Sequence, residues 1–284
     1  MAGRLIVCPT PIGNLGDMTP RALEQLRAAD TVCAEDTRVT GKLLAHFGIE
    51  KRLERLDEAA ITHQAGRVAQ RVAAGETVAF CSDAGMPGVS DPGARLIEAV
   101  RDAGGDVSVL PGASAAVTAY VASGFNNPRF FFGGFFPRKD GERRAALASI
   151  AALDAVSMFY ESPRRIASAL SSVAEAFPDR EAAVCRELTK VHEEVVRAST
   201  SDLRDEFMRR DEEQGGVKGE IVLVIGPPTH DERHRVREDA NDAAAKHARV
   251  LAAEGAHTRK EIAKILRDEF GIARNDAYDL AMKA

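Results

Sequence analysis

The sequence lacks the residue patterns that identify several large classes of ligand-binding protein. It contains neither a Gly-x-Gly-x-x-Gly fingerprint nor a glycine-rich loop ending in Gly-Lys-Ser/Thr, which excludes the two common sites for dinucleotides and nucleoside triphosphates. The seven histidines show no metal-ligand spacing, and we expect no metal. The four cysteines are scattered singly, which is neither a disulfide framework nor a zinc spacing and is typical of a reducing cytoplasm. They are Cys8, Cys33, Cys81 and Cys185.

Positive charge and long apolar segments are also scarce. The formal net charge is −5, so any contact with nucleic acid has to come from a local patch of cations. Residues 107–128 carry no charge, but Pro111, Gly112 and Asn126 interrupt them, and a buried strand followed by a helix explains them better than a membrane span. Residues 1–4 lead straight into a short strand without a signal-peptide core. We therefore expect a cytoplasmic protein that does not associate with a membrane.

The composition that remains is that of a globular protein with two or three domains. The chain has 284 residues, of which 45% are apolar and 29% charged. Its first part alternates short apolar runs with helical patterns, which predicts a largely parallel sheet. Thr19 and Pro20 open one of the helices as its cap and first residue. The strands predicted here are Leu5–Val7, Thr31–Ala34, Thr77–Cys81 and Val107–Leu110.

The most informative segment is the polar loop at residues 82–93, which follows the predicted strand Thr77–Cys81. Its glycines let the backbone approach a ligand closely, and Asp83 offers a fixed carboxylate. We expect Asp91 to cap the next helix, with Pro92 at the first helical position. Ligands bind at the carboxyl ends of parallel strands, so the loops after the four strands predict a binding site at one edge of the sheet. For this loop taken alone, a purely structural turn is the alternative.

The second half of the chain has a different pattern. Two strands close together around residues 191–192 suggest an antiparallel pair, which predicts a mixed α/β arrangement. Residues 229–284 are helical, with a capping box at Thr258–Glu261 and Asn275 as the cap of a last helix. The two short helices across Gly271 resemble a helix-turn-helix, and a small helical cap that only packs is the alternative. The strands predicted here are Phe130–Phe136, Val156–Tyr160, Ala182–Cys185, Glu194–Arg197 and Ile221–Ile225.

Six motifs occur in an order that is specific as a set. They are TPIGNLGD at 10–17, AEDTR at 34–38, SDAGMPGVSDPG at 82–93, FYESPRR at 159–165, RELTKVHEE at 186–194 and KGEIVLVIG at 218–226. Through these motifs the chain resembles the tetrapyrrole methylase superfamily and, within it, the ribosomal RNA small subunit methyltransferase I family. The resemblance runs from residue 4 to residue 228 and is weaker in the helical tail.

The resemblance implies an α/β fold with two unequal α/β domains of the tetrapyrrole methylase type, at residues 1–122 and 123–228, and a small helical domain at residues 229–284. It also implies S-adenosylmethionine in a cleft between the α/β domains, a homodimer, and 2′-O-methylation of a decoding-centre cytidine in 16S rRNA of the small ribosomal subunit. Met86 stands where the motif more often has Thr, a change expected to alter packing more than chemistry. The positions that match the family's cofactor cleft are Pro11, Asp83, Met86, Val89, Ser114, Ala115, Glu161, Leu188 and Glu220.

Methyl transfer to a ribose would make use of an acidic residue. The methyl leaves by in-line displacement, so most of the catalysis comes from holding it near the nucleophile. A ribose hydroxyl is a poor nucleophile, however, and a carboxylate that accepts its proton would help. The positions of the loops make Glu35, Asp36 and Glu187 the candidates for this base. The alternatives are a structural salt bridge between Asp36 and Arg38, and a solvated strand end at Glu187.

Cations near the same loops are candidates for binding the substrate. Contacts to phosphate and ribose position an RNA without reading its bases. Phe135 and Phe136 offer a surface on which a splayed base could stack, although such a cluster belongs more often to a core. The candidate substrate-binding residues are Arg38, Arg138, Lys139, Arg186 and Lys190.

Two other functions fit the same sequence. A methyltransferase that acts on a tetrapyrrole, or one of the diphthine type, would share the fold, and a fold does not decide a substrate. A non-catalytic RNA-binding or ribosome-assembly factor would use the cleft only as a scaffold. Such a factor would bind its ribosomal target equally with or without S-adenosylmethionine. The AEDTR and FYESP motifs and the helical tail favour the RNA methyltransferase.

Overall fold

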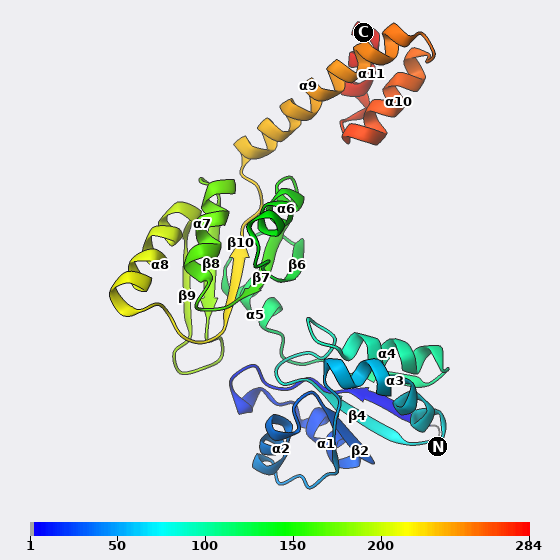
Figure 1. The fold of residues 1–284 in the computed structure, drawn as a ribbon, viewed down its shortest axis with the longest axis vertical. Coiled ribbons are helices and arrows are strands. Elements are labelled where there is room, and N and C mark those ends of the chain that lie inside the picture. The colour runs from blue at the N-terminus through cyan, green and yellow to red at the C-terminus, as the bar shows by residue number, and fades with distance from the viewer. Residues whose placement is uncertain (1–2) are drawn as a thin grey trace.

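The computed structural model describes residues 3–284, apart from the side chains of Gln214, Val236 and Arg237. It contains two α/β units, each built on a five-stranded sheet, and a helical tail that a long helix holds away from both (Figure 1). The predicted α/β class is confirmed. The boundaries at 122/123 and 228/229 stay a prediction. Within the described residues, no helix combines the length and the apolar character that crossing a membrane requires.

The first unit is built on a sheet in which every pairing is parallel, as the sequence predicts. The strand order is β3-β2-β4-β1-β5, so β1 and β4 lie at the centre. The short strand β3 was not predicted, because Leu53 is its one apolar residue and the strand lies at the edge of the sheet. The strands are β1 (Arg4–Val7), β2 (Thr31–Ala34), β3 (Leu53–Arg55), β4 (Thr77–Cys81) and β5 (Asp106–Val109).

Helices cover both faces of this sheet. Alternate residues of β1 point to opposite sides: Leu5 packs with α3 and α4, and Ile6 packs with α1 and α2. The cap at Thr19 is confirmed, since its side chain accepts a hydrogen bond from the Ala22 amide. The expected start of α4 is wrong: the helix begins at Gly93 with Pro92 at the cap position, and Asp91 accepts bonds from the Gly88 amide in the loop and from the Gly93 amide at the start of the helix. The helices are α1 (Pro20–Ala28), α2 (Thr37–His46), α3 (Glu58–Ala73) and α4 (Gly93–Asp102), with a 3₁₀ turn at Leu15–Asp17.

The second unit has a mixed sheet of order β6-β7-β10-β8-β9. β6 and β7 pair in parallel, and the remaining pairs are antiparallel, which confirms the predicted β8–β9 hairpin. Its strands are β6 (Phe130–Phe135), β7 (Val156–Glu161), β8 (Glu181–Arg186), β9 (Glu194–Ser199) and β10 (Ile221–Ile225).

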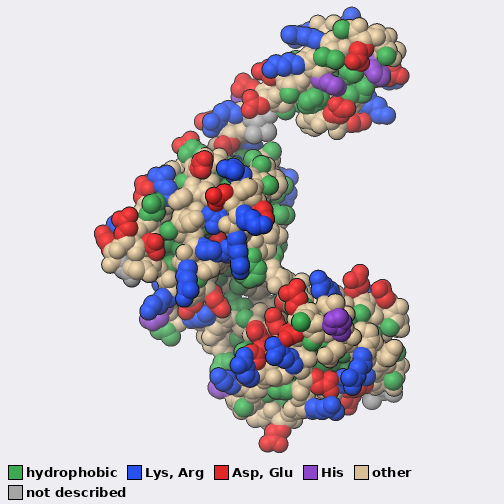
Figure 2. All heavy atoms as spheres, viewed as in Figure 1, with side chains coloured by type: hydrophobic (Ala, Val, Ile, Leu, Met, Phe, Trp, Pro, Cys, Tyr) green, Lys and Arg blue, Asp and Glu red, His purple; other side chains and the backbone are tan. Residues whose placement is uncertain are grey.

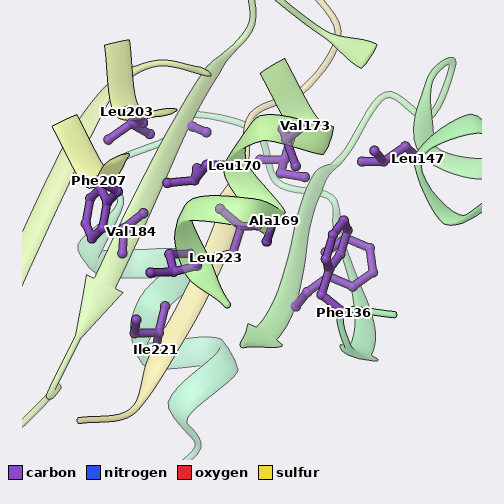
Figure 3. Close-up of a cluster of buried hydrophobic side chains, with 14 of the residues drawn as sticks. Phe136, Leu147, Ala169, Leu170, Val173, Val184, Leu203, Phe207, Ile221 and Leu223 are labelled. Carbon is purple, nitrogen blue, oxygen red and sulfur yellow. The ribbon is translucent and has the colours of Figure 1, made fainter. Parts of the chain in front are cut away.

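Each face of the second sheet packs on helices. One face packs on α6 (Asp140–Ile150), α7 (Ile166–Ala176) and α8 (Thr200–Gln214), where Phe136, Leu170 and Leu223 belong to one core (Figure 3). The other face packs on α5 (Ala115–Ala122), whose small residues let the helix lie close to β7 and β10. Helix α5 therefore joins the second sheet, although it follows directly after the last strand of the first.

The tail is a three-helix bundle, formed by α9 (His230–Glu254), α10 (Arg259–Phe270) and α11 (Arg274–Lys283). The capping box at Thr258 is confirmed, but α11 begins at Arg274, so Asn275 is not its cap. The first turn of α9 is tied to the second unit by Glu232, which pairs with the buried Arg180 at 3.0 Å. The same carboxylate accepts a hydrogen bond from the Thr229 amide, so one side chain both caps the helix and fixes it to the second unit.

We expect Gly66→Ala to raise the stability of the first unit. Gly66 lies inside α3 on the exposed side, and a Cβ there would meet no atom within 4 Å. Alanine should therefore add about 0.5–1 kcal/mol, because it loses less conformational entropy in a helix. Urea unfolding measures the gain. The matched control is Gly104→Ala, which is equally open but has φ of +74°; an equal gain at both positions would contradict the explanation.

Candidate functional site

The loops after four strands of the first sheet meet at one edge, as predicted. Thr10 and Gly85 exchange two backbone hydrogen bonds of 3.0 Å, which join the loops after β1 and β4. The Asp36 amide donates to Asp83 Oδ1 at 3.0 Å, and the Asp83 amide donates to Glu35 Oε2 at 3.3 Å. These bonds join the loops after β2 and β4, so the polar residues of three motifs form one hydrogen-bonded edge.

A cleft of about 700 Å³ lies between this edge and the second sheet. The first unit contributes its floor, including Ile12, Gly85 and Met86, and the second unit contributes Tyr160, Leu188 and Gly219, among others. Figure 2 shows a narrow waist between the two α/β units. Lys and Arg side chains lie on the second unit, in the middle of the view, next to this waist. A volume of this size lies within the range of roughly 300–1,000 Å³ that is typical of small-molecule sites.

The residues matched to the family's cofactor cleft gather here. Pro11 lies outside the lining, and its neighbour Ile12 takes part instead. The matched residues in the lining are Asp83, Met86, Val89, Ser114, Ala115, Glu161, Leu188 and Glu220.

The charges that line the cleft are divided between its two walls. The wall from the first unit carries the carboxylates of Glu35, Asp83 and Asp91. The wall from the second unit carries three arginines and two carboxylates: Arg138, Arg164, Arg165, Glu161 and Glu220. A bound molecule with a cationic part and an anionic part would place the cationic part against the carboxylates of the first unit and the anionic part against the arginines of the second unit.

A buried ion pair forms one wall of the cleft. The Glu161 side chain is fully buried, and its Oε1 accepts from Arg165 and from the Ser162 amide, both at 2.5 Å. Glu161 Oε2 and Arg165 Nη1 have no hydrogen-bond partner within the described residues, although both are buried. Burial raises the pKa of the Glu161 carboxyl, against the lowering effect of Arg165. Buried polar atoms without partners are rare in folded proteins, so these two, beside a cleft, are candidates for hydrogen bonds to a bound ligand.

The three candidate bases have different surroundings. Glu35 lines the cleft, and burial raises the pKa of its carboxyl. Asp36 lies outside the lining, caps α2 and pairs with Arg38 at 2.6 Å, and these bonds hold its pKa far below the usual range. Glu187 also lies outside the lining, and its bond from Lys190 lowers its pKa. Asp36 thus adopts the structural salt bridge that was the alternative interpretation.

The five candidate substrate-binding cations also differ in their ion-pair partners and in whether they line the cleft. Lys190 pairs with Glu187 and Glu220 at 2.8 and 3.0 Å. Arg186 pairs with Glu194 at 3.0 Å, and Lys139 pairs with Glu142 at 3.1 Å. Arg38 is held by Asp36, as described above. Arg138 alone among the five lines the cleft, and it has no carboxylate partner in the described part of the chain.

Relatives cover almost the whole chain. The chain is 38% identical over 282 residues to the ribosomal RNA small subunit methyltransferase I of Neisseria meningitidis serogroup B, which covers 99% of this chain and 94% of that protein. It is 37% identical over 278 residues to the Bacillus subtilis protein of the same name, covering 98% and 93%. The chain belongs to the ribosomal RNA small subunit methyltransferase I family.

Wider comparisons agree on the fold of this ribosomal RNA small subunit methyltransferase I family member. Residues 4–204 match the family described as Tetrapyrrole (Corrin/Porphyrin) Methylases. The structure of a diphthine synthase superposes with a TM-score of 0.60 at 15% identity, over 82% of this chain and 94% of that one. A cobalt precorrin-4 methyltransferase superposes with a TM-score of 0.56 at 18% identity, over 78% and 94%. The fold class and the family predicted from the sequence are confirmed.

Backbone strain marks the rim of the cleft in this family member. Ser90, Glu187 and Thr189 have positive φ values of 63°, 51° and 67°, the three such non-glycine residues in the described chain. Ser90 lines the cleft, and the other two flank Leu188, which also lines it. A Cβ at Gly13 would overlap Lys190 and Thr189, so the loop after β1 lies directly against this strained segment. Strain of this kind persists where surrounding contacts fix a site.

Several lining residues of this family member were not singled out from the sequence. Tyr160 falls within the FYESPRR motif, and Gly219 falls within KGEIVLVIG, so the motifs did contain the signal. Gly219 has φ of +98°, and a Cβ there would overlap the Glu187 side chain. Among residues 3–284, no three His, Cys, Asp or Glu side chains are arranged to hold a metal ion.

Proposed function

We propose that this chain methylates the 2′-hydroxyl of a decoding-centre cytidine in 16S rRNA, with S-adenosylmethionine as methyl donor. The observation that carries the proposal is the match to relatives named ribosomal RNA small subunit methyltransferase I, which covers 98–99% of the chain. The cleft between the two α/β units supports it, because the motifs shared with that family line the cleft from both sides. The enzyme would act where small subunits are found, in the cytoplasm.

The cleft fits S-adenosylmethionine in size and chemistry. This donor is a sulfonium cation with an amino-acid end and an adenine, and it supplies an activated methyl group when bound. The carboxylates of Glu35, Asp83 and Asp91 suit a cationic molecule, and Glu161 Oε2 is a buried acceptor without a partner. Gly85, with φ of +78°, gives the floor a backbone conformation that other residues rarely adopt and lets it lie against Ile12.

Glu35 is the best-placed base. It faces the cleft, and the Asp83 amide holds its Oε2 in position. Burial raises its pKa, which makes its carboxylate a stronger acceptor for the ribose proton. As the base, Glu35 accepts the proton of the 2′-hydroxyl while the cleft holds this hydroxyl and the methyl group near attack distance. Arg138 and Arg164, on the opposite wall, suit the phosphates on either side of the target nucleotide.

The test is methyl transfer to small ribosomal subunits from a strain that lacks the enzyme. The purified chain is incubated with these subunits and S-adenosylmethionine labelled in its methyl group, and the labelled nucleotide is mapped. We expect one labelled cytidine, with the label on its ribose. Label on a base, on a protein or on nothing would contradict the proposal.

The same assay separates the rival functions. A tetrapyrrole or diphthine-type enzyme would leave small subunits unlabelled and would transfer methyl to a macrocycle or to a protein side chain instead. A scaffold without catalysis would bind small subunits equally well with and without S-adenosylmethionine and would transfer nothing. The full-length match to the rRNA-named relatives favours the ribosomal substrate over both.

We also expect a homodimer. Apolar side chains are exposed along α5 and β6, including Val121 at 70% and Phe130 at 49%. A face of this kind is suited to a self-complementary interface, which buries roughly 1,200–2,000 Å² in typical stable pairs. Light scattering at micromolar concentration should give twice the mass of the chain, which is 30.5 kDa. A monomer mass there would refute the expectation.

A further inference from the structure

One aromatic side chain in the cleft is conspicuously uncovered. Phe135 lines the cleft, yet 63% of it is exposed, whereas its neighbour Phe136 is buried in the core of the second unit. The Phe135 ring meets the ring of Tyr160 edge to face, with centroids 5.5 Å apart. Tyr160 also lines the cleft. The sequence places both phenylalanines in one apolar cluster, and the structure gives them opposite environments.

A bulge in β6 decides which of the two phenylalanines faces the cleft. Phe132 pairs with Met158 and Phe135 pairs with Tyr160, so β6 has one residue more than β7 between the two pairs. Side chains alternate along a strand, and without the extra residue Phe135 would point to the face occupied by α7. The bulge turns Phe135 instead to the cleft face, which it shares with Tyr160. Bulges that redirect a side chain in this way are concentrated near active sites.

Glycines hold the bulge in place. Gly134 has φ of +72°, a conformation that other residues rarely adopt. A Cβ at Gly133 would overlap the Phe159 ring. The bulge also lies beside the first unit, because a Cβ at Gly134 would come within 3.5 Å of Ser90 Oγ. Phe135 is therefore presented at the junction of the two units, where a substrate would enter.

Unpaired cations share this part of the rim. Arg138 follows Phe135 by three residues, Arg164 extends from the loop after β7, and both line the cleft. Neither side chain has an ion-pair partner among the described residues. Aromatic rings with free arginines close by form the usual surface for a single-stranded nucleic acid, since every base has a face that stacks and every nucleotide has a phosphate.

We propose that Phe135, supported by Tyr160, is a stacking platform for one unpaired base of the RNA substrate, with Arg138 and Arg164 holding the adjoining phosphates. This inference rests on the proposed function and adds a site for the target nucleotide to it. The base leaves its stack and lies on the Phe135 ring, so that its ribose reaches the cleft.

The first test uses the absence of tryptophan from the chain. Phe135→Trp introduces a single indole at the platform, and a stacked base quenches indole fluorescence. Titration with a short oligocytidylate should quench this variant progressively. The matched control is Phe131→Trp: Phe131 lies on the same strand, is 39% exposed and packs edge to face on Phe159, on the other side of the sheet. Quenching of the Phe135 variant alone supports the platform; equal quenching of both, or of neither, overturns it.

The second test measures catalysis. Phe135→Ala should lower kcat/KM for small subunits by about 10-fold to 100-fold, the loss expected for one stacked base. Its affinity for S-adenosylmethionine, measured by calorimetry, should be unchanged, and Phe135→Tyr should restore most of the activity. Wild-type rates for Phe135→Ala, or a loss of cofactor binding, would overturn the platform. If the wild-type chain labels no subunits, the proposed function fails, and the fluorescence titration still decides the platform independently.

Discussion

Glu35→Gln should lower kcat for methylation of small subunits by about 100-fold to 10,000-fold, the range that a positioned general base contributes. Glutamine keeps the size of the side chain and can still accept the Asp83 amide bond through its carbonyl oxygen, so the loops should remain joined. It cannot accept the ribose proton. Cofactor affinity should therefore stay close to that of the wild type, which calorimetry can verify.

The pH profile gives a second signature of Glu35. A base works only when it is deprotonated, so the rate should fall as the pH drops through the pKa of this group. Burial raises that pKa, and the fall should therefore begin at a higher pH than it would for an ordinary carboxyl. In Glu35→Gln this acidic limb should disappear. A variant that keeps both the limb and the rate would show that Glu35 is not the base.

Glu193→Gln is the matched control for this experiment. Glu193 lies in the hairpin loop after β8, is exposed, and accepts a bond from the Thr189 amide, outside the lining of the cleft. We expect its rate and its pH profile to resemble those of the wild type. A loss as large as that of Glu35→Gln would mean that negative charge in general, rather than one positioned carboxylate, drives the reaction.

Arg180→Met should lower the free energy of unfolding by about 3–5 kcal/mol, the usual effect of breaking a buried ion pair. The Arg180 side chain is 2% exposed, and Glu232, its partner, is 12% exposed. The guanidinium also donates to the Ala151 carbonyl and stacks on Phe177, 3.8 Å from the ring centroid. Methionine would leave the Glu232 carboxylate partly buried without a cation. Urea unfolding measures the loss.

A surface arginine provides the contrast. Arg209 pairs with Glu206 and Glu213 on α8 but is 50% exposed, and Arg209→Met should cost less than about 1 kcal/mol. The double variant Arg180→Met/Glu232→Leu should recover only part of the stability lost by the single one, because it removes the unpaired charge but also the cap bond from the Thr229 amide. Equal losses at Arg180 and Arg209 would show that burial does not govern these pairs.

The strands were the part of the fold that the sequence predicted best. Thr31–Ala34, Thr77–Cys81 and Ile221–Ile225 were predicted with their observed bounds, because each is an apolar run ended by turn residues. The start of α4 was harder to place. The Asp91 side chain bonds to the Gly88 amide in the loop as well as to the first amide of the helix, and that geometry depends on how the loop folds rather than on residue type.

The site was predictable as a set of motifs but not as a set of roles. The order of the motifs located most of the lining residues. It could not show that Lys190 is held by Glu220, since the two lie 30 residues apart and meet only in the folded chain. Nor could it show which phenylalanine faces the cleft, because one additional residue in β6 reverses the alternation.

The length of helix α9 sets both the distance and the orientation of the tail relative to the second unit. Its 25 residues rise about 1.5 Å each, so its far end lies roughly 37 Å from the first turn that Glu232 anchors. Each residue added to it would turn the tail by about 100° as well as moving it outward. An insertion of seven residues leaves a rotation of about 20°, and about 18 residues, which make five full turns, restore the original orientation. The reach and the orientation of the tail are thus geometrically coupled for insertions or deletions shorter than about 18 residues.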